Sequence, residues 1–77
     1  MLSGYVLIEA EPGKAEEINA RLHDLRGVSQ CHLVTWPFDV IAFVESGDLQ
    51  TAGDLILHEI QRIPGVLKTV TCVVMGE

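Results

Sequence analysis

Positive charge is scarce in this chain. Five Lys and Arg residues stand against eleven Asp and Glu residues, which gives a formal charge of −6 and a pI near 4.8. A surface that binds nucleic acid must neutralise phosphates, and this requires an excess of positive charge. We therefore expect no direct contact with nucleic acid.

Long apolar runs and targeting signals are also missing. No uninterrupted apolar stretch approaches the ~20 residues that a membrane helix needs. The first residues, MLSGY, carry neither the basic region nor the cleavage site of a secretory signal. The sequence predicts a cytoplasmic protein that makes no contact with a membrane.

Cysteine is rare, and no metal-binding spacing occurs. Cys31 and Cys72 are too few for a disulfide framework, form no CxxC pair, and each falls within a predicted strand. We expect both to be buried free thiols that act as small apolar residues. His32 follows Cys31 directly, but neighbours in a strand point to opposite faces and cannot share one ion. No metal and no cofactor are expected.

The usual catalytic motifs are absent. The chain contains no GxSxG, P-loop, HExxH or GxGxxG pattern, and no convincing Ser/His/Asp order. The sequence therefore predicts no catalytic residues and a protein that is not an enzyme.

Apolar residues, in contrast, are abundant. They make up 48% of the 77 residues, only 21% are charged, and the mean hydropathy is +0.31. A chain of this size forms one domain and buries only about 60% of the surface that its unfolded form exposes. The excess apolar surface predicts a partner.

The segment Leu33–Glu45 lies at the middle of the chain, between two halves with similar patterns. Two apolar runs flank the break Trp36-Pro37-Phe38-Asp39, and Pro37 cannot donate a hydrogen bond to a strand. This pattern predicts a β-hairpin. Asp39 has two open interpretations: it accepts backbone amides in the turn, or it holds the ammonium group of a ligand.

Strands and amphipathic helices alternate along the chain. Apolar residues at steps of three and four indicate the helices, and runs of strand formers between Gly and Pro breakers indicate the strands. Asp48 is the expected N-cap of the second helix. The predicted strands are Gly4–Ala10, Val28–Thr35, Val40–Glu45 and Val66–Met75, and the predicted helices are Lys14–Arg26 and a segment from Asp48 to about Arg62.

An internal repeat relates the two halves at an offset of 38 residues. Gly27 corresponds to Gly65 and Val28 to Val66, with matching apolar positions in the helices before them. The order βαββαβ with this repeat predicts an α+β class protein, a ferredoxin-like plait. We expect a four-stranded antiparallel sheet with both helices on one face, as a single domain over residues 1–77.

The strands are apolar on both of their faces. A sheet with one exposed face shows alternation, but segments 6–8, 40–44 and 72–75 are continuously apolar. Because two helices cover only one side, the sequence predicts that a second copy covers the other, in a face-to-face homodimer of the dimeric α/β barrel type. The alternative is a monomer with an apolar surface.

These segments together resemble a known family. Leu33-Val34-Thr35, Pro37-Phe38-Asp39-Val40, Ile63-Pro64-Gly65-Val66 and the run from Thr69 to Val74 are similar to the effector-binding (RAM) domain of Lrp/AsnC transcriptional regulators, over Gly4 to Met75. The resemblance implies sheet-to-sheet dimers that assemble into octamer or decamer rings. It also implies that a free amino acid binds at the contact between dimers.

The resemblance further implies an effector site. Asp39 would hold the ammonium group, and threonines would contact the carboxylate or polar tail. The family turn has Gly where Trp36 stands, so an indole there would close or reshape the pocket and be strained if the position needs a positive φ. The residues matched by position are Leu33, Thr35, Trp36, Phe38, Asp39, Leu49, Thr69 and Thr71.

The expected function is a stand-alone effector-binding and oligomerisation module. Too few residues precede the first strand for a DNA-binding domain, so the chain would modulate amino acid metabolism through partners such as full-length Lrp/AsnC regulators. One alternative is a cofactor-free enzyme of the dimeric barrel type, but the region between sheet and helices has Val, Ile and Leu in place of polar groups. Another is a purely structural oligomerisation domain in which Trp36 fills the pocket.

Overall fold

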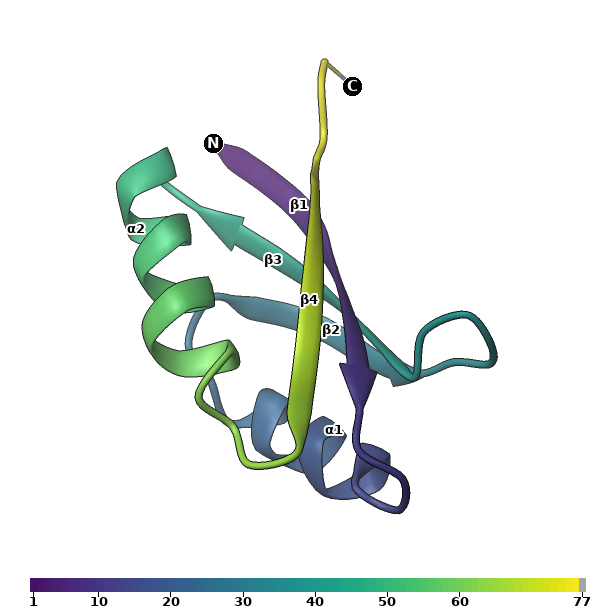
Figure 1. Ribbon diagram of the computed structural model, residues 1–77. Coiled ribbons are helices and arrows are strands. Elements are labelled where there is room, and N and C mark those ends of the chain that lie inside the picture. Colours follow the sequence, from purple (N-terminus) through teal and green to yellow (C-terminus); the bar gives the residue numbers. More distant parts are fainter. Residues whose placement is uncertain (77) are drawn as a thin grey trace.

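The predicted order of elements is confirmed. A computed structural model describes residues 1–76 and contains four strands and two helical segments (Figure 1). The second helix continues into a π-helical turn, η1. The elements are β1 (Leu2–Ala10), α1 (Ala15–His23), β2 (Val28–Leu33), β3 (Val40–Ser46), α2 (Leu49–Leu55), η1 (Ile56–Ile60) and β4 (Val66–Val73).

The strands form one antiparallel sheet in the order β2-β3-β1-β4. Ile8 of β1 lies between Val40 of β3 and Thr69 of β4, which sets the register of the three strands. The side chains that point toward the helices are buried, whereas the opposite face is not covered. This is the ferredoxin-like plait that the sequence predicts.

The 38-residue repeat appears in the backbone hydrogen bonds. After α1, the amides of Leu25 and Val28 each donate to the carbonyl three residues earlier, at 3.1 and 3.3 Å. After η1, the amides of Ile63 and Val66 do the same, at 3.2 and 3.1 Å. The two halves therefore leave their helices through the same turn.

Each of these turns requires glycine. Gly27 and Gly65 have φ values of +100° and +98°, which L-residues with a side chain rarely adopt. A Cβ on Gly65 would also lie 2.8 Å from the Cβ of Lys14. The turn begins earlier than periodicity predicts, so α1 ends at His23 instead of Arg26.

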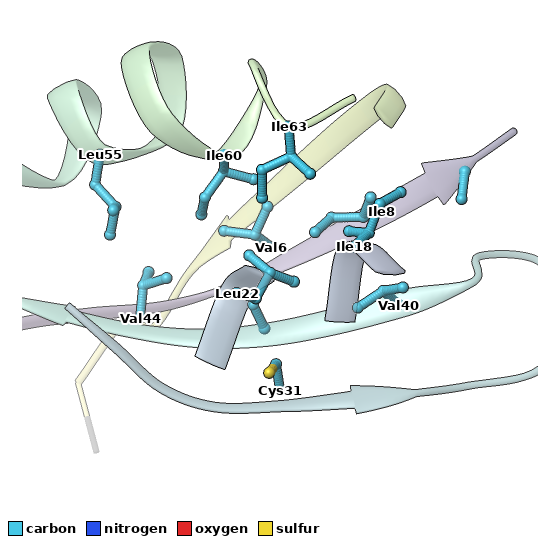
Figure 2. Packing of buried hydrophobic residues seen from close by; sticks show 12 residues of the cluster. Val6, Ile8, Ile18, Leu22, Cys31, Val40, Val44, Leu55, Ile60 and Ile63 are labelled. Atoms are coloured by element: carbon cyan, nitrogen blue, oxygen red, sulfur yellow. The ribbon is translucent and has the colours of Figure 1, made fainter. Parts of the chain in front are cut away.

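The core lies between the helices and the two central strands, β1 and β3. Figure 2 shows side chains from α2 and η1 above those of the sheet. Among the described residues no polar or charged side chain is buried in this layer. The core consists of Val6, Ile8, Ala10, Ile18, Leu22, Cys31, Val40, Ala42, Val44, Leu55, Ile60 and Ile63.

The π-helical turn η1 changes which residues face the sheet. In a regular helix the residue four after Leu55, Glu59, would point inward with it. The amide of Gln61 instead donates to the carbonyl of Ile56, five residues back, at 2.9 Å. The extra residue buries both Leu55 (6% exposed) and Ile60 (0%) and leaves Glu59 in solvent.

Asp48 caps α2, as predicted. Its carboxylate accepts a 2.7 Å hydrogen bond from the amide of Thr51, which together with the Thr51 side chain lowers the pKa of Asp48. Because the folded pKa is lowered, the stabilising effect is present above the unfolded-state pKa and is lost as pH falls through the folded one.

Gly53, inside α2, offers a test of the helix. A Cβ built on it meets no atom within 4 Å, and a glycine inside a helix costs roughly 0.5–1 kcal/mol relative to alanine. Gly53→Ala is therefore expected to raise the free energy of unfolding by that amount, measured by urea denaturation. Gly65→Ala, at a positive φ, is the control and is expected to destabilise. A loss of stability in Gly53→Ala would contradict the open environment of this residue.

The cysteines and histidines lie in different environments. Cys31 is buried, which raises the pKa of its thiol, and His32 is exposed on the opposite face of β2. Cys72 is exposed in the single chain, so the prediction that both thiols are buried is wrong for it. Its side chain lies on the face that no helix covers.

Residues 1–76 contain neither a membrane-spanning helix nor a cluster of metal ligands. No helix there is both long and apolar enough to cross a membrane. The same residues contain no group of three or more His, Cys, Asp or Glu side chains that could hold a metal ion.

Candidate functional site

The sheet face opposite the helices is apolar at its centre. Tyr5 of β1 lies between Phe43 of β3 and Cys72 of β4, and the Tyr5 and Phe43 rings are 4.9 Å apart. The next row along the strands contains Val70, Leu7, Ile41 and His32. Tyr5 remains 44% exposed. The two rows form a continuous surface, which we call the outer face.

Charged residues border the outer face. Glu9 of β1 lies opposite Lys68 of β4, one row beyond Leu7 and Val70. Glu45 of β3 lies toward the other end, opposite Ser3. An apolar centre with a polar rim is typical of a protein interface.

The hairpin between β2 and β3 is held to the sheet by Asp39. The amide of Val34 donates to the Asp39 carbonyl and the amide of Asp39 to the carbonyl of Ile8, both at 2.9 Å. The Asp39 carboxylate accepts a 2.8 Å bond from the amide of Ala10 through Oδ2. Asp39 therefore accepts a hydrogen bond from a backbone amide, as in the first interpretation. The donor is an amide of β1, however, and does not belong to the turn itself.

The geometry of Asp39 is also compatible with the second interpretation, in which it holds the ammonium group of a ligand. Within the described chain its other oxygen, Oδ1, accepts no hydrogen bond, and the residue is only half-buried. A carboxylate fixed by one backbone bond, with a second oxygen toward solvent, has the chemistry to accept an ammonium donor.

Trp36 fills no pocket within the chain. Its side chain is 90% exposed, and Leu33 beside it is 47% exposed. No non-glycine residue among positions 1–76 has a positive φ, so the tryptophan is accommodated without the backbone strain expected if this position needed one. Phe38 is half-buried, and Thr35 is exposed.

Thr69 and Thr71 share one face of β4, as their spacing predicts. They are paired with the buried residues Ile8 and Val6, which places them on the helix side of the sheet. The Thr69 hydroxyl accepts a 2.8 Å hydrogen bond from the side-chain amide of Gln61. A hollow of about 240 Å³ beside this pair is also lined by Val66, Leu67 and Lys68. The sequence pattern does not identify Gln61, because a polar residue near a helix end carries no local signal for this contact.

The eight predicted effector residues do not form one site within the chain. The hairpin is separated from the threonines of β4 by β1. Leu49 begins α2, beyond the far end of β3, with 68% of its side chain exposed. Figure 1 shows α2 on the opposite side of the molecule from the hairpin. A site that uses all eight residues therefore requires more than one chain.

Comparison with protein families gives one clear match. The model of the family described as "Lrp/AsnC ligand binding domain" matches residues 3–77. The Leucine-responsive regulatory protein of Haemophilus influenzae is 35% identical over 71 residues, which are 92% of this chain and 43% of that protein. The chain thus spans less than half the length of this relative.

Solved structures show the same fold. A protein of Thermus thermophilus superposes with a TM-score of 0.95 at 25% identity, covering 100% of this chain and 96% of that one. A transcriptional regulator of Neisseria meningitidis in complex with L-Met has a TM-score of 0.88 at 18% identity, covering 99% of this chain and 51% of that one.

Proposed function

This chain belongs to the Lrp/AsnC ligand-binding domain family, and from that premise we propose that it binds an amino-acid effector and oligomerises through its sheet. The observation that carries the proposal is the fixed, half-buried carboxylate of Asp39 on an apolar hairpin. The fold shared with a regulator that binds L-Met supports an amino acid as the ligand class.

The assembly begins with a face-to-face homodimer. The outer face presents Tyr5, Leu7, Ile41, Phe43 and Val70 to solvent, with no helix over them. Removal of apolar surface from water stabilises association by roughly 25 cal/mol per Å². When two copies are related by a two-fold axis, their outer faces contact each other and both are buried. Dimers then associate into octamer or decamer rings.

The effector binds where dimers meet. Asp39 accepts the ligand ammonium, and Leu33, Thr35, Trp36 and Phe38 surround it from the same hairpin. The other part of the site comes from Thr69 and Thr71 of a neighbouring copy, because β1 separates these residues from the hairpin within one chain. Leu49 begins α2, at the opposite end of the helical segment from the Gln61 that bonds Thr69, so it does not join the two threonines in one copy.

The regulatory role is exerted through partner proteins. The matched relatives are regulatory proteins longer than this chain, and the net charge of −6 opposes direct binding to phosphates. We place the chain in the cytoplasm, where it co-assembles with longer Lrp/AsnC regulators and modulates amino acid metabolism. Pull-down of such a regulator by the tagged chain, lost when the ring contacts are mutated, tests this step.

Amino-acid binding is tested with Asp39→Asn. The amide oxygen still accepts the Ala10 hydrogen bond, but the charge that holds the ammonium group is lost. A hydrogen bond to a charged group contributes about 1.5–3 kcal/mol, so binding is expected to weaken roughly 10- to 100-fold. Calorimetric titration with the twenty amino acids identifies the ligand and measures the loss.

The control for this titration is Glu16→Gln, which removes a negative charge from the exposed first turn of α1. It is expected to leave binding unchanged. If no amino acid gives heat or raises the melting temperature of the wild-type chain, effector binding is wrong. A stable dimer without any ligand would then favour the second candidate, a structural oligomerisation domain.

The enzyme alternative has less support. Cofactor-free catalysis between the sheet and the helices requires polar groups there, and the described core contains no buried polar or charged side chain. The matched relative is a regulatory protein.

A further inference from the structure

We propose that a hollow between α1 and η1 is a second binding site, which takes a zwitterion: a ligand with an ammonium group, a carboxylate and an apolar side chain. A free amino acid or a short peptide has this chemistry. The site lies within one chain and uses no residue of the hairpin, so it is independent of the effector site proposed above.

The hollow has an apolar floor. Its volume is about 330 Å³, near the lower end of the roughly 300–1,000 Å³ that is typical of small-molecule sites. Leu25, Ile63 and Pro64 form the apolar part of its lining. Ile63 belongs to the core, above the sheet in Figure 2, and Leu25 packs against that core. The apolar side chain of a ligand in the hollow therefore extends the core outward.

The walls of the hollow carry charges of both signs. Arg21 and Asp24 come from the end of α1, and Glu59 and Arg62 come from η1 and the segment after it. At the 38-residue offset of the internal repeat, Arg21 corresponds to Glu59 and Asp24 to Arg62. Equivalent positions of the two halves thus carry opposite charges, and each wall presents one positive and one negative group.

These four charged groups are available to a ligand. Among residues 1–76, the ion pairs are those of Lys14 with Glu17 and of His58 with Asp54, so none of the four takes part in one. All four side chains are exposed. Hydrogen bonds with an ionised donor or acceptor are about twice as strong as neutral ones. A ligand that offers the complementary charges therefore gains strong contacts without breaking an ion pair of the hollow.

The mixed charge selects the class of ligand. A simple anion that approaches the two guanidinium groups also meets two carboxylates, and a simple cation meets the reverse. A zwitterion satisfies both signs. Its carboxylate accepts hydrogen bonds from Arg21 or Arg62, whose planar guanidinium matches carboxylate geometry. Its ammonium group donates to Asp24 or Glu59.

The hollow remains open in the face-to-face dimer. It lies on the helix side of the sheet, between α1 and the segment that leaves η1, whereas the dimer uses the outer face. Figure 1 shows the hairpin that carries Asp39 on the side of the molecule opposite α2. The hollow and the hairpin share no residue, so binding at each can be measured separately.

Calorimetric titration of the Asp39→Asn chain tests the hollow, because this variant weakens the proposed effector site. The probes are leucine and the dipeptide leucyl-leucine, whose apolar side chains suit the floor. We expect one ligand to bind per chain. Tighter binding of leucine identifies a free amino acid as the source of the zwitterion, and tighter binding of the dipeptide identifies a short peptide.

Two further variants in the Asp39→Asn background remove one charge of each sign from the hollow. Arg62→Gln and Glu59→Gln each lose a hydrogen bond between charged groups, so binding is expected to weaken roughly 10-fold or more. Probes with one charge removed, N-acetyl-leucine and leucinamide, are expected to weaken similarly. Arg26→Gln, outside this hollow, is the matched control and is expected to bind like the background chain. Circular dichroism confirms the fold of each variant.

Three results would each overturn the proposal. The first is that neither zwitterion binds the Asp39→Asn chain at the highest soluble ligand concentration. The second is that binding is unchanged by Arg62→Gln or Glu59→Gln, and the third is that the capped probes bind as tightly as leucine. Failure of the proposed function gives a different result: the wild-type and Asp39→Asn chains then bind the same ligands equally well, and the variants of the hollow still weaken that binding.

Discussion

Replacement of Ile41 by lysine is expected to convert the dimer into a folded monomer. Ile41 lies in the row of the outer face that also contains Leu7, Val70 and His32. In the single chain a lysine there reaches solvent, but in the dimer its ammonium group is enclosed between two apolar sheets. The penalty is several kcal/mol per buried ion, so the dissociation constant should rise by roughly 100-fold or more.

Sedimentation equilibrium at micromolar concentration measures this change, with circular dichroism to confirm the fold. Leu57→Lys is the control, because Leu57 is 56% exposed in η1, away from the outer face, and the variant is expected to remain a dimer. If the Ile41→Lys chain stays dimeric, the interface lies elsewhere. A folded wild-type monomer of 8.4 kDa would show that the outer face needs no cover.

Replacement of Ile60 by alanine is expected to cost about 2–5 kcal/mol of unfolding free energy, the range for truncation of large buried aliphatic side chains. Ile60 is fully buried against the sheet and lies in the π-helical turn that follows Leu55. Small domains have roughly 5–15 kcal/mol of stability in total. The variant is therefore expected to be close to unfolding at physiological temperature.

Urea denaturation at one fixed protein concentration measures this loss, since dimerisation itself contributes to stability. Leu57→Ala is the comparison, because an exposed residue of the same turn should change stability by only about 0.5 kcal/mol. If Ile60→Ala and Leu57→Ala lost the same unfolding free energy, η1 would not direct Ile60 toward the sheet and Leu57 toward solvent.

Much of the fold follows from the sequence because its causes are local. Gly27 and Gly65 mark the two helix exits, since only glycine readily adopts their positive φ. Asp48 is recognisable as a cap because its short carboxylate reaches the Thr51 amide. Apolar periodicity and the 38-residue repeat then leave the ferredoxin-like plait as the favoured arrangement.

The ends and phase of the helices do not follow from local pattern. Periodicity continues α1 to Arg26, but the chain must turn at His23 to enter β2. In the second helix, Leu55 and Ile60 are five residues apart, and the π-helical turn between them accompanies the burial of both. The π-helical turn depends on how the helix packs against the sheet. Contacts with distant strands of this kind cannot be read from a short stretch of sequence.

The sequence alone determined the order of the elements, the repeat, the two apolar faces of the sheet and the hairpin with Asp39, because each depends on nearby residues. Only the tertiary structure decided that Asp39 binds the Ala10 amide of β1, that Gln61 holds Thr69, and that Arg21 and Arg62 flank one hollow. These groups are brought together by the register of the strands and the approach of the two helices. Contacts of that kind depend on the packing of the whole chain, so the neighbouring residues in the sequence do not predict them.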